Sequence, residues 1–315
     1  MSDRIRFGLF LDLFLLPLKY IEFEALALEG ERLGYDSVWI CDHLMKREAP
    51  ILECWTTLSA LCSKTDKVRL GTLVACNSFR NPALLAKMAA TLDVISKGRL
   101  ELGIGAGWNQ DGHQAYGVPF PKISVRVKQM KEGIEIIKRM WTEEKVNYRG
   151  RYFRVKDASC EPKPLQEPHP PITVGGGGEK LTLKVTAEHA NRSNWFGTPE
   201  QCKHKLNVLE KYCSQIGRDH EEIEKSVSLG VNISYDEQEL TKNLKKCYAS
   251  GEPHLSFHDW LKEFRTKMIG GPPSKCLEKM REYVDLGITY FMLRFLDLPS
   301  EKGMKLFNEE VIQKI

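Results

Sequence analysis

An acidic residue and a histidine stand directly after a strand-like segment near the amino terminus. The segment DSVWIC (36–41) is followed by Asp42 and His43. A carboxylate beside an imidazole can hold the ring in one tautomer and move its pKa across neutrality, which suits a histidine to proton transfer. We therefore take His43 as a candidate acid–base group, with Asp42 as its partner. The alternative interpretation is that the pair merely ends a strand at the protein surface.

Two glycine-rich segments have the composition of ligand-binding loops. Gly107, Trp108 and Asn109 follow another strand-like run, where glycine lets a flat ligand approach the main chain and the other two residues supply an apolar wall and an amide. Four glycines precede a helix and would expose N–H groups to a phosphate; they are Gly175, Gly176, Gly177 and Gly178. This is not a nucleotide fingerprint. A tight packing turn and a flexible loop are the respective alternatives.

Strand-like runs alternate with amphipathic segments along the whole chain. The predicted strands are Ile5–Leu11, Ser37–Cys41, Val68–Val74, Leu100–Gly105, Pro171–Gly175, Arg192–Phe196, Ser226–Ile233 and Thr289–Phe295. The predicted helices are Tyr20–Leu33, Ile51–Lys64, Pro82–Ile95, Val125–Trp141, Lys180–His189, Pro199–Ile216 and Ser274–Leu286. This alternation predicts an α/β fold, a (β/α)8 TIM barrel formed by residues 1–315 as a single domain. A doubly wound sheet with a cap domain is the alternative.

The long connection after Gly105 contains a predicted hairpin over Val146–Phe153, and such insertions shape the mouth of a barrel. The net charge of only +4 does not favour nucleic acid or a membrane surface as a partner. The apolar runs are too short to span a bilayer. Nine cysteines without a CxxC pair indicate buried free thiols and no metal site. We expect a cytoplasmic protein that acts on a small molecule.

Several motifs in order resemble the bacterial-luciferase-like family of β/α-barrel oxidoreductases. They are GYDSVWICDHL (34–44), KVRLGTLVACNSFRNPALLAKMAATLDVISKGRLELGIGAGWN (67–109), AYGVPFP (115–121), PKPLQEPHPPITVGGGGEK (162–180), SNWFGTPEQC (193–202) and LGITYFMLRF (286–295). That family uses either FMN or its 8-hydroxy-5-deazaflavin counterpart, coenzyme F420. The chain is most similar to the deazaflavin-dependent branch.

The resemblance implies roles for individual positions. His43 matches the proton donor or acceptor beside the deazaflavin ring, and Asp42 matches its neighbour. Leu73 and Val74 match a bulge with a non-proline cis peptide behind the ring. The segment Gly107 to Asn109 matches residues that line the cofactor, and Gly176 to Gly178 match the loop that holds its phosphate.

The chain departs from the pattern of many relatives at Gly112 and Asn191, where they have an acidic residue and an aspartate. These departures weaken any transfer of substrate contacts. Arg294, at the end of the last predicted strand, is a candidate contact for an anionic substrate or the cofactor tail, with a salt bridge as the alternative. The family often dimerises, so we expect a homodimer.

The resemblance implies an F420-dependent oxidoreductase that transfers a hydride between C5 of the deazaflavin and a small organic substrate. His43 would be the acid–base group, and Asp42 would set its tautomer or contact a polar group of the cofactor. Two alternatives stay open. One is a monooxygenase that uses reduced FMN together with a partner reductase, and the other is a non-catalytic flavin-binding barrel.

Overall fold

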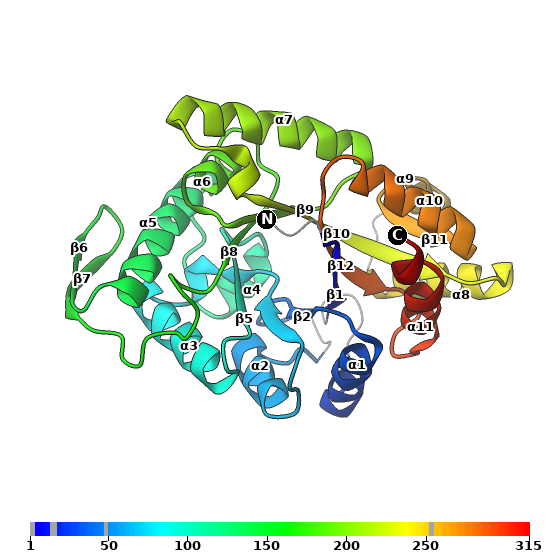
Figure 1. Cartoon of the computed structure of the whole chain (residues 1–315), viewed down its shortest axis with the longest axis horizontal. Helices are drawn as coiled ribbons and strands as arrows, with labels where there is room; N and C mark the ends of the chain where they lie inside the picture. The colour runs from blue at the N-terminus through cyan, green and yellow to red at the C-terminus, as the bar shows by residue number, and fades with distance from the viewer. Residues whose placement is uncertain (1–3, 13–17, 47–49, 252–254) are drawn as a thin grey trace.

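The computed structural model describes residues 4–12, 18–46, 50–251 and 255–315. Eight parallel strands close into a barrel, and helices surround them (Figure 1). The strands are β1 (Arg6–Leu11), β2 (Ser37–Ile40), β3 (Arg69–Thr72), β5 (Leu100–Gly105), β8 (Ile172–Gly175), β9 (Arg192–Trp195), β10 (Glu224–Ile233) and β12 (Tyr290–Phe295). Strand β1 pairs with both β2 and β12, which closes the ring. The predicted barrel and its eight strand positions are confirmed.

The helices lie between the strands in sequence and outside them in space. They are α1 (Tyr20–Leu33), α2 (Cys54–Cys62), α3 (Pro82–Ile95), α4 (Gln110–Ala115), α5 (Ile123–Thr142), α6 (Thr182–His189), α7 (Pro199–Ile216), α8 (Glu237–Gly251), α9 (Phe257–Thr266), α10 (Pro273–Val284) and α11 (Lys302–Glu310). Helix α7 illustrates how local sequence signals fix both ends of a helix. Thr198 caps it with a capping box, Pro199 starts it, and Gly217 ends it at a φ of 70°.

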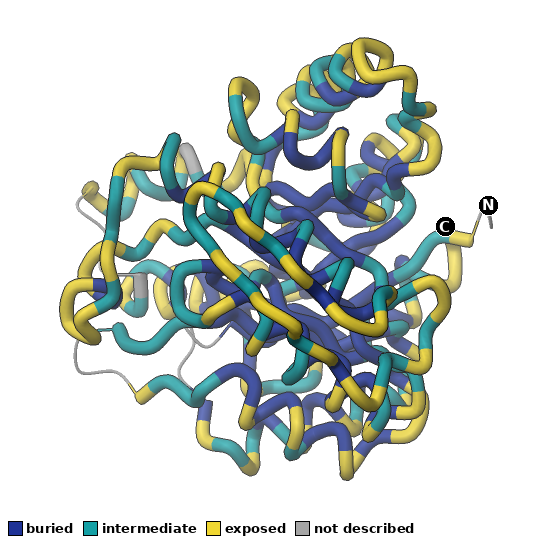
Figure 2. Tube along the Cα trace, turned by 90° about the vertical axis from the view of Figure 1, so that its left-hand side faces the viewer, coloured by how far each residue is buried: buried dark blue, intermediate teal, exposed yellow. Residues whose placement is uncertain are grey.

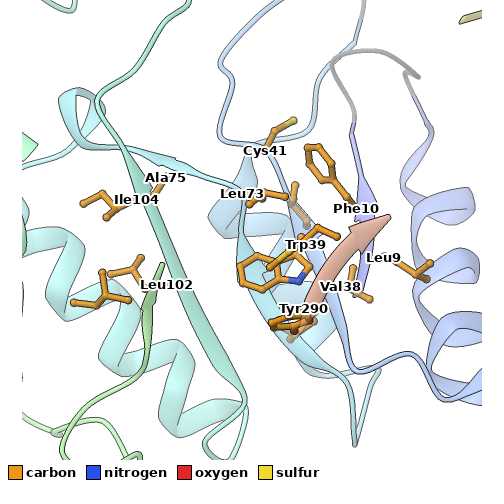
Figure 3. Packing of buried hydrophobic residues seen from close by; sticks show 14 of the residues in the cluster. Leu9, Phe10, Val38, Trp39, Cys41, Leu73, Ala75, Leu102, Ile104 and Tyr290 are labelled. Carbon is orange, nitrogen blue, oxygen red and sulfur yellow. The ribbon is translucent and has the colours of Figure 1, made fainter. Parts of the chain in front are cut away.

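The centre of the barrel is filled by a tryptophan from β2. Trp39 is fully buried, and its indole N–H donates to Ser37 Oγ at 2.7 Å. A Cβ atom at Gly8 or Gly71, on the neighbouring strands, would lie within 3 Å of the indole, so both positions require glycine. The ring of Tyr290 meets Trp39 edge-on with centroids 6.0 Å apart (Figure 3). The barrel is therefore a packed core below its mouth.

The amino-terminal ends of the strands hold a buried charge network, which we call the base network. Its members are Arg6, Arg69, Glu101, Arg192 and Glu224. One oxygen of Glu101 lies 2.6 Å from Arg192 Nη1 and the other lies 2.5 Å from Arg69 Nε. Burial alone would raise the pKa of Glu101, but Arg192 and Arg69 lower it below its ordinary value. Each buried charge in this network has a partner of opposite sign.

The insertions account for the elements that the sequence did not predict. Strands β6 (Val146–Arg149) and β7 (Arg154–Ala158) form a hairpin beside α5, as predicted, but its second strand begins just after the predicted range Val146–Phe153. Strand β4 (Ala75–Cys76) pairs with β5, and β11 (Met268–Gly271) pairs with β10. Helices α4, α8, α9 and α11 were not predicted. Figure 2 shows buried residues concentrated along the barrel strands, with exposed residues on the outer turns.

The nine cysteines are free and buried, as predicted. Within the described ranges, the helices are too short or too polar to cross a bilayer.

Candidate active site

A cavity of about 510 Å³ opens where the strands end at their carboxyl side. This is the face on which β/α barrels carry their active sites, and the volume lies within the range of small-molecule pockets. The segments that follow β2, β3, β5, β8 and β9 all contribute to its wall. His43 follows β2 and the glycine loop 175–177 lies at the end of β8, with β3 and β5 between these two strands in the ring, so one elongated ligand could contact both sides of the cavity.

His43 lines the cavity and is half-buried. Its ring meets the indole of Trp108 edge-on, with centroids 5.3 Å apart. Burial lowers the pKa of His43 below its ordinary value, and the carboxylates of Asp12 and Asp42 only partly oppose that shift. The neutral imidazole is therefore the favoured form near pH 7, and a neutral imidazole can accept a proton.

Asp42 also lines the cavity, but its carboxylate is engaged by other groups. Arg80 donates to it twice, from Nη1 at 2.6 Å and from Nη2 at 3.1 Å, and the Cys76 N–H donates at 3.0 Å. Arg80 also pairs with Glu53, which caps α2 through the Thr56 N–H. Asp42 thus fixes the end of β2 against the segments around it. Its assignment as the group that sets the tautomer of His43 stays a prediction.

The floor of the cavity is formed by Leu73 and Val74, which are joined by a non-proline cis peptide bond. The sequence placed such a bond here through the family resemblance. Val74 packs against two glycines that end neighbouring strands, since a Cβ at Gly105 or at Gly175 would lie 2.6 Å from one of its methyl groups. Glycine at both positions lets Val74 present an apolar surface on which a flat ring can lie.

One side of the cavity is formed by the segment after β5. Gly107, Trp108 and Asn109 all line it, and their contact with a cofactor stays a prediction. Asn109 caps α4 by accepting from the Gly112 N–H at 3.2 Å. A Cβ atom at Gly112 would lie 3.2 Å from the Asn109 amide nitrogen, so the glycine leaves room for this cap. The Asn109 side chain therefore belongs to the helix cap as well as to the cavity wall.

The cavity wall also contains a pair of residues that the sequence did not single out. The Cys76 sulfur lies 3.6 Å from His113 Nε2, and His113 Nδ1 donates to the Asn109 carbonyl at 2.7 Å. In the neutral ring, Nε2 then carries the lone pair and accepts from the thiol. Burial raises the pKa of Cys76 to about 11, so the thiol stays protonated. The pair is a hydrogen bond within the cavity wall.

The glycine loop forms another side of the cavity. Gly175, Gly176 and Gly177 line it, whereas Gly178 is the next residue toward α6. The Gly176 N–H donates to the Asn194 carbonyl at 2.8 Å, and the hydrogen bonds of the described residues include none from the N–H groups of Gly177 and Gly178. Lys205, from the second turn of α7, lines this side and donates to the Gly177 carbonyl at 3.0 Å. The loop therefore combines main-chain donors with a cation.

Two residues that the sequence analysis singled out, Arg294 and Asn191, make structural contacts in the protein. Arg294 donates from Nη1 to Asp12 Oδ2 at 2.9 Å, which is the salt bridge that the sequence left open, and it does not line the cavity. Asn191 accepts from the Ile172 N–H at 3.0 Å and joins two strand starts. Lys205 and Thr182 were missed because they reach the cavity from helices whose sequence patterns carry no ligand signal.

Comparison with known proteins identifies the family. The family model described as luciferase-like monooxygenase matches residues 15–290. The chain belongs to the luciferase-like monooxygenase family. Relatives from Intrasporangium calvum and Microbacterium testaceum, both named F420-dependent glucose-6-phosphate dehydrogenase, are 28% identical to it. The alignments cover 88% and 95% of this chain and 93% and 94% of the relatives.

A solved structure of this luciferase-like fold superimposes closely on the chain. It is an F420-dependent secondary alcohol dehydrogenase in complex with an F420–acetone adduct, with a TM-score of 0.85. Its sequence is 21% identical, and the match covers 98% of both chains. The agreement extends over the barrel and its insertions, and it establishes the luciferase-like fold.

Proposed function

We propose that the protein is an oxidoreductase that transfers a hydride between C5 of coenzyme F420 and a small organic substrate. The observation that carries this proposal is the joint placement of His43 and the glycine loop 175–177 in one cavity. Full-length relatives of the luciferase-like family that are named F420-dependent support the choice of cofactor.

The residues of the cavity fit a long, anionic cofactor with a flat ring. Val74 provides an apolar face between Gly105 and Gly175, where no side chain competes for space. At the glycine loop, the N–H groups of Gly177 and Gly178 and the ammonium group of Lys205 would hold a phosphate. An apolar surface that suits a flat ring and a cationic loop that suits a phosphate support the proposal.

Coenzyme F420, when bound, supplies a two-electron hydride donor or acceptor. The protein has to orient the substrate, exclude water and move one proton. His43 is suited to accept this proton, because burial lowers its pKa and keeps the imidazole ring neutral. Trp108 packs against that imidazole ring, and Leu73 and Val74 line the same cavity. Asp42 and Arg80 hold the strand end that carries His43.

The test is a pair of titrations of the purified protein, one with coenzyme F420 and one with FMN, followed by the fluorescence of each cofactor. We expect F420 to bind with a Kd on the order of 1 μM, about 8 kcal/mol of binding free energy, and FMN to bind far more weakly. Tight FMN binding together with oxygen consumption in the presence of a flavin reductase would instead identify a monooxygenase. Tight binding of either cofactor without turnover would favour a storage protein.

A further inference from the structure

We infer that the substrate of this site is a neutral, largely hydrocarbon molecule and not a phosphorylated sugar. This inference rests on the proposed function, since it concerns the part of the same cavity that the cofactor leaves to the substrate. It separates the chain from the relatives named for glucose 6-phosphate. Two independent observations carry it: the charges near the mouth are already paired, and the rim is apolar.

Arginines close to the cavity are neutralised or held by other groups. Arg80 is bonded to Asp42 and Glu53, and Arg294 is bonded to Asp12. The third, Arg126, is buried, donates to the carbonyls of Ala106 and Gly107, and stacks on a phenylalanine ring 3.8 Å away. None of these guanidinium groups lines the cavity.

Among the described cationic side chains, Lys205 is the one that lines the cavity, and it lies at the glycine loop. The cofactor phosphate would occupy this position. Among the residues that the structure describes, no further cation lines the cavity to face a second phosphate carried by the substrate. An unpaired dianion loses its hydration without compensation, so the cavity disfavours a phosphorylated substrate.

The rim of the cavity has the opposite character. Trp108, Ile123 and Phe196 line the opening and are 64%, 52% and 58% exposed. Exposed large apolar side chains are common singly, but three around one opening form an apolar surface that a ligand can cover. Because Trp108 contacts His43, a molecule that packs on the indole also approaches the proton-accepting ring. The substrate surface that faces this rim should therefore be hydrocarbon.

The experiment compares two probes in the F420-loaded protein by isothermal titration calorimetry. The neutral probe is 4-phenyl-2-butanone, and the charged probe is glucose 6-phosphate. We expect the neutral probe to bind at least tenfold more tightly. Tighter binding of glucose 6-phosphate would overturn the inference.

Variants of the rim residues test whether the rim itself binds the neutral probe, and an exposed control position accounts for any general effect of a substitution on the protein. We expect Trp108→Ala and Phe196→Ala each to weaken binding of the neutral probe at least threefold. Phe196→Lys should strengthen binding of glucose 6-phosphate. Leu165→Ala is the matched control, because Leu165 is 57% exposed and does not line the cavity. Equal effects of Phe196→Ala and Leu165→Ala would contradict a role for the rim.

Failure of the inference and failure of the proposed function give different results. Loading with F420 is measured first, by its own fluorescence. If F420 does not bind, the proposed cofactor is wrong, and the two probes are then compared in the FMN-loaded or cofactor-free protein. Preference for the neutral probe there would still support the apolar rim, and preference for glucose 6-phosphate would overturn it.

Discussion

The two ends of the barrel use charged residues in opposite ways. At the base, Arg192 is buried, and its guanidinium bonds to Glu101 and Glu224 at 2.6 Å each. At the mouth, His43 and Lys205 line an open cavity, where a ligand can reach them. The charged residues at the base therefore hold strands together, whereas those at the mouth are accessible to a ligand and available for chemistry. Variants at the two ends should therefore change different measured quantities.

His43→Gln should give the largest effect on chemistry. Removing an acid–base group lowers turnover by a factor of about 10²–10⁴. The affinity for F420 and the free energy of unfolding should change little, because the ring is half-buried and borders the cavity. Stopped-flow absorbance of the cofactor with a bound substrate measures the rate. Unchanged hydride transfer would remove His43 from the mechanism.

Glu101→Gln should give the largest effect on stability. The substitution leaves Arg192 buried with less compensating charge, and breaking a buried pair from one side costs about 3–5 kcal/mol. Urea unfolding measures this loss. The control is Glu222→Gln, which removes a pair with Arg218 whose carboxylate is 59% exposed, and it should cost about 1 kcal/mol or less. Similar losses in the two variants would mean that the base network contributes no more than a surface pair.

Asp42→Asn tests a residue at the mouth whose carboxylate is held in a buried ion pair, as the charges of the base network are. Its carboxylate is buried and takes two bonds from Arg80, so we expect a loss near the lower end of about 3–5 kcal/mol in unfolding free energy. Turnover should fall less than in His43→Gln. A stable Asp42→Asn protein with turnover as low as that of His43→Gln would show that Asp42 acts directly on the imidazole.

Lys205→Gln should weaken cofactor binding without affecting the fold. A hydrogen bond to a charged group contributes about 1.5–3 kcal/mol, so the Kd for F420 should rise about tenfold or more. Lys203→Gln is a suitable control, because Lys203 is exposed on the same helix and does not line the cavity. Equal Kd values in the two variants would place the phosphate elsewhere.

The change of the reaction rate with pH, caused by protonation of His43, should be the smallest of these effects. Burial lowers its pKa, so the ring stays neutral as the pH falls through about 6.5, the ordinary value for histidine, and gains its proton only at lower pH. The rate of a step in which His43 accepts a proton should then be constant near neutrality and decline in acid. Proton NMR of the imidazole measures the midpoint directly. A midpoint above 6.5 would contradict this account of its environment.

The sequence predicted the elements whose ends carry strong local signals. Helices α1, α3 and α7 have the predicted bounds, because Pro82 and Pro199 start two of them and Gly34 and Gly217 end two of them in left-handed geometry. Helices α8 and α9 were missed because they belong to an insertion and pack against a small cluster of their own.

The candidate site was predictable where its residues directly follow strands. His43 and Val74 follow strands and Gly175 ends one, and a barrel gathers strand ends on one face. Arg80, the partner of Asp42, lies 38 residues away in sequence and could not be found from local pattern. Lys205 reaches the glycine loop from a separate helix, 28 residues beyond Gly177. Contacts of this length depend on the closed barrel.

The central claim is that the mouth binds coenzyme F420 independently of the base. The most direct test is the Kd for F420, measured by fluorescence in the wild type, Lys205→Gln and Glu101→Gln under conditions where all three are folded. We predict binding near 1 μM in the wild type and in Glu101→Gln, and about tenfold weaker binding in Lys205→Gln. Absence of F420 binding to the wild type, or the same loss in both variants, would contradict the claim.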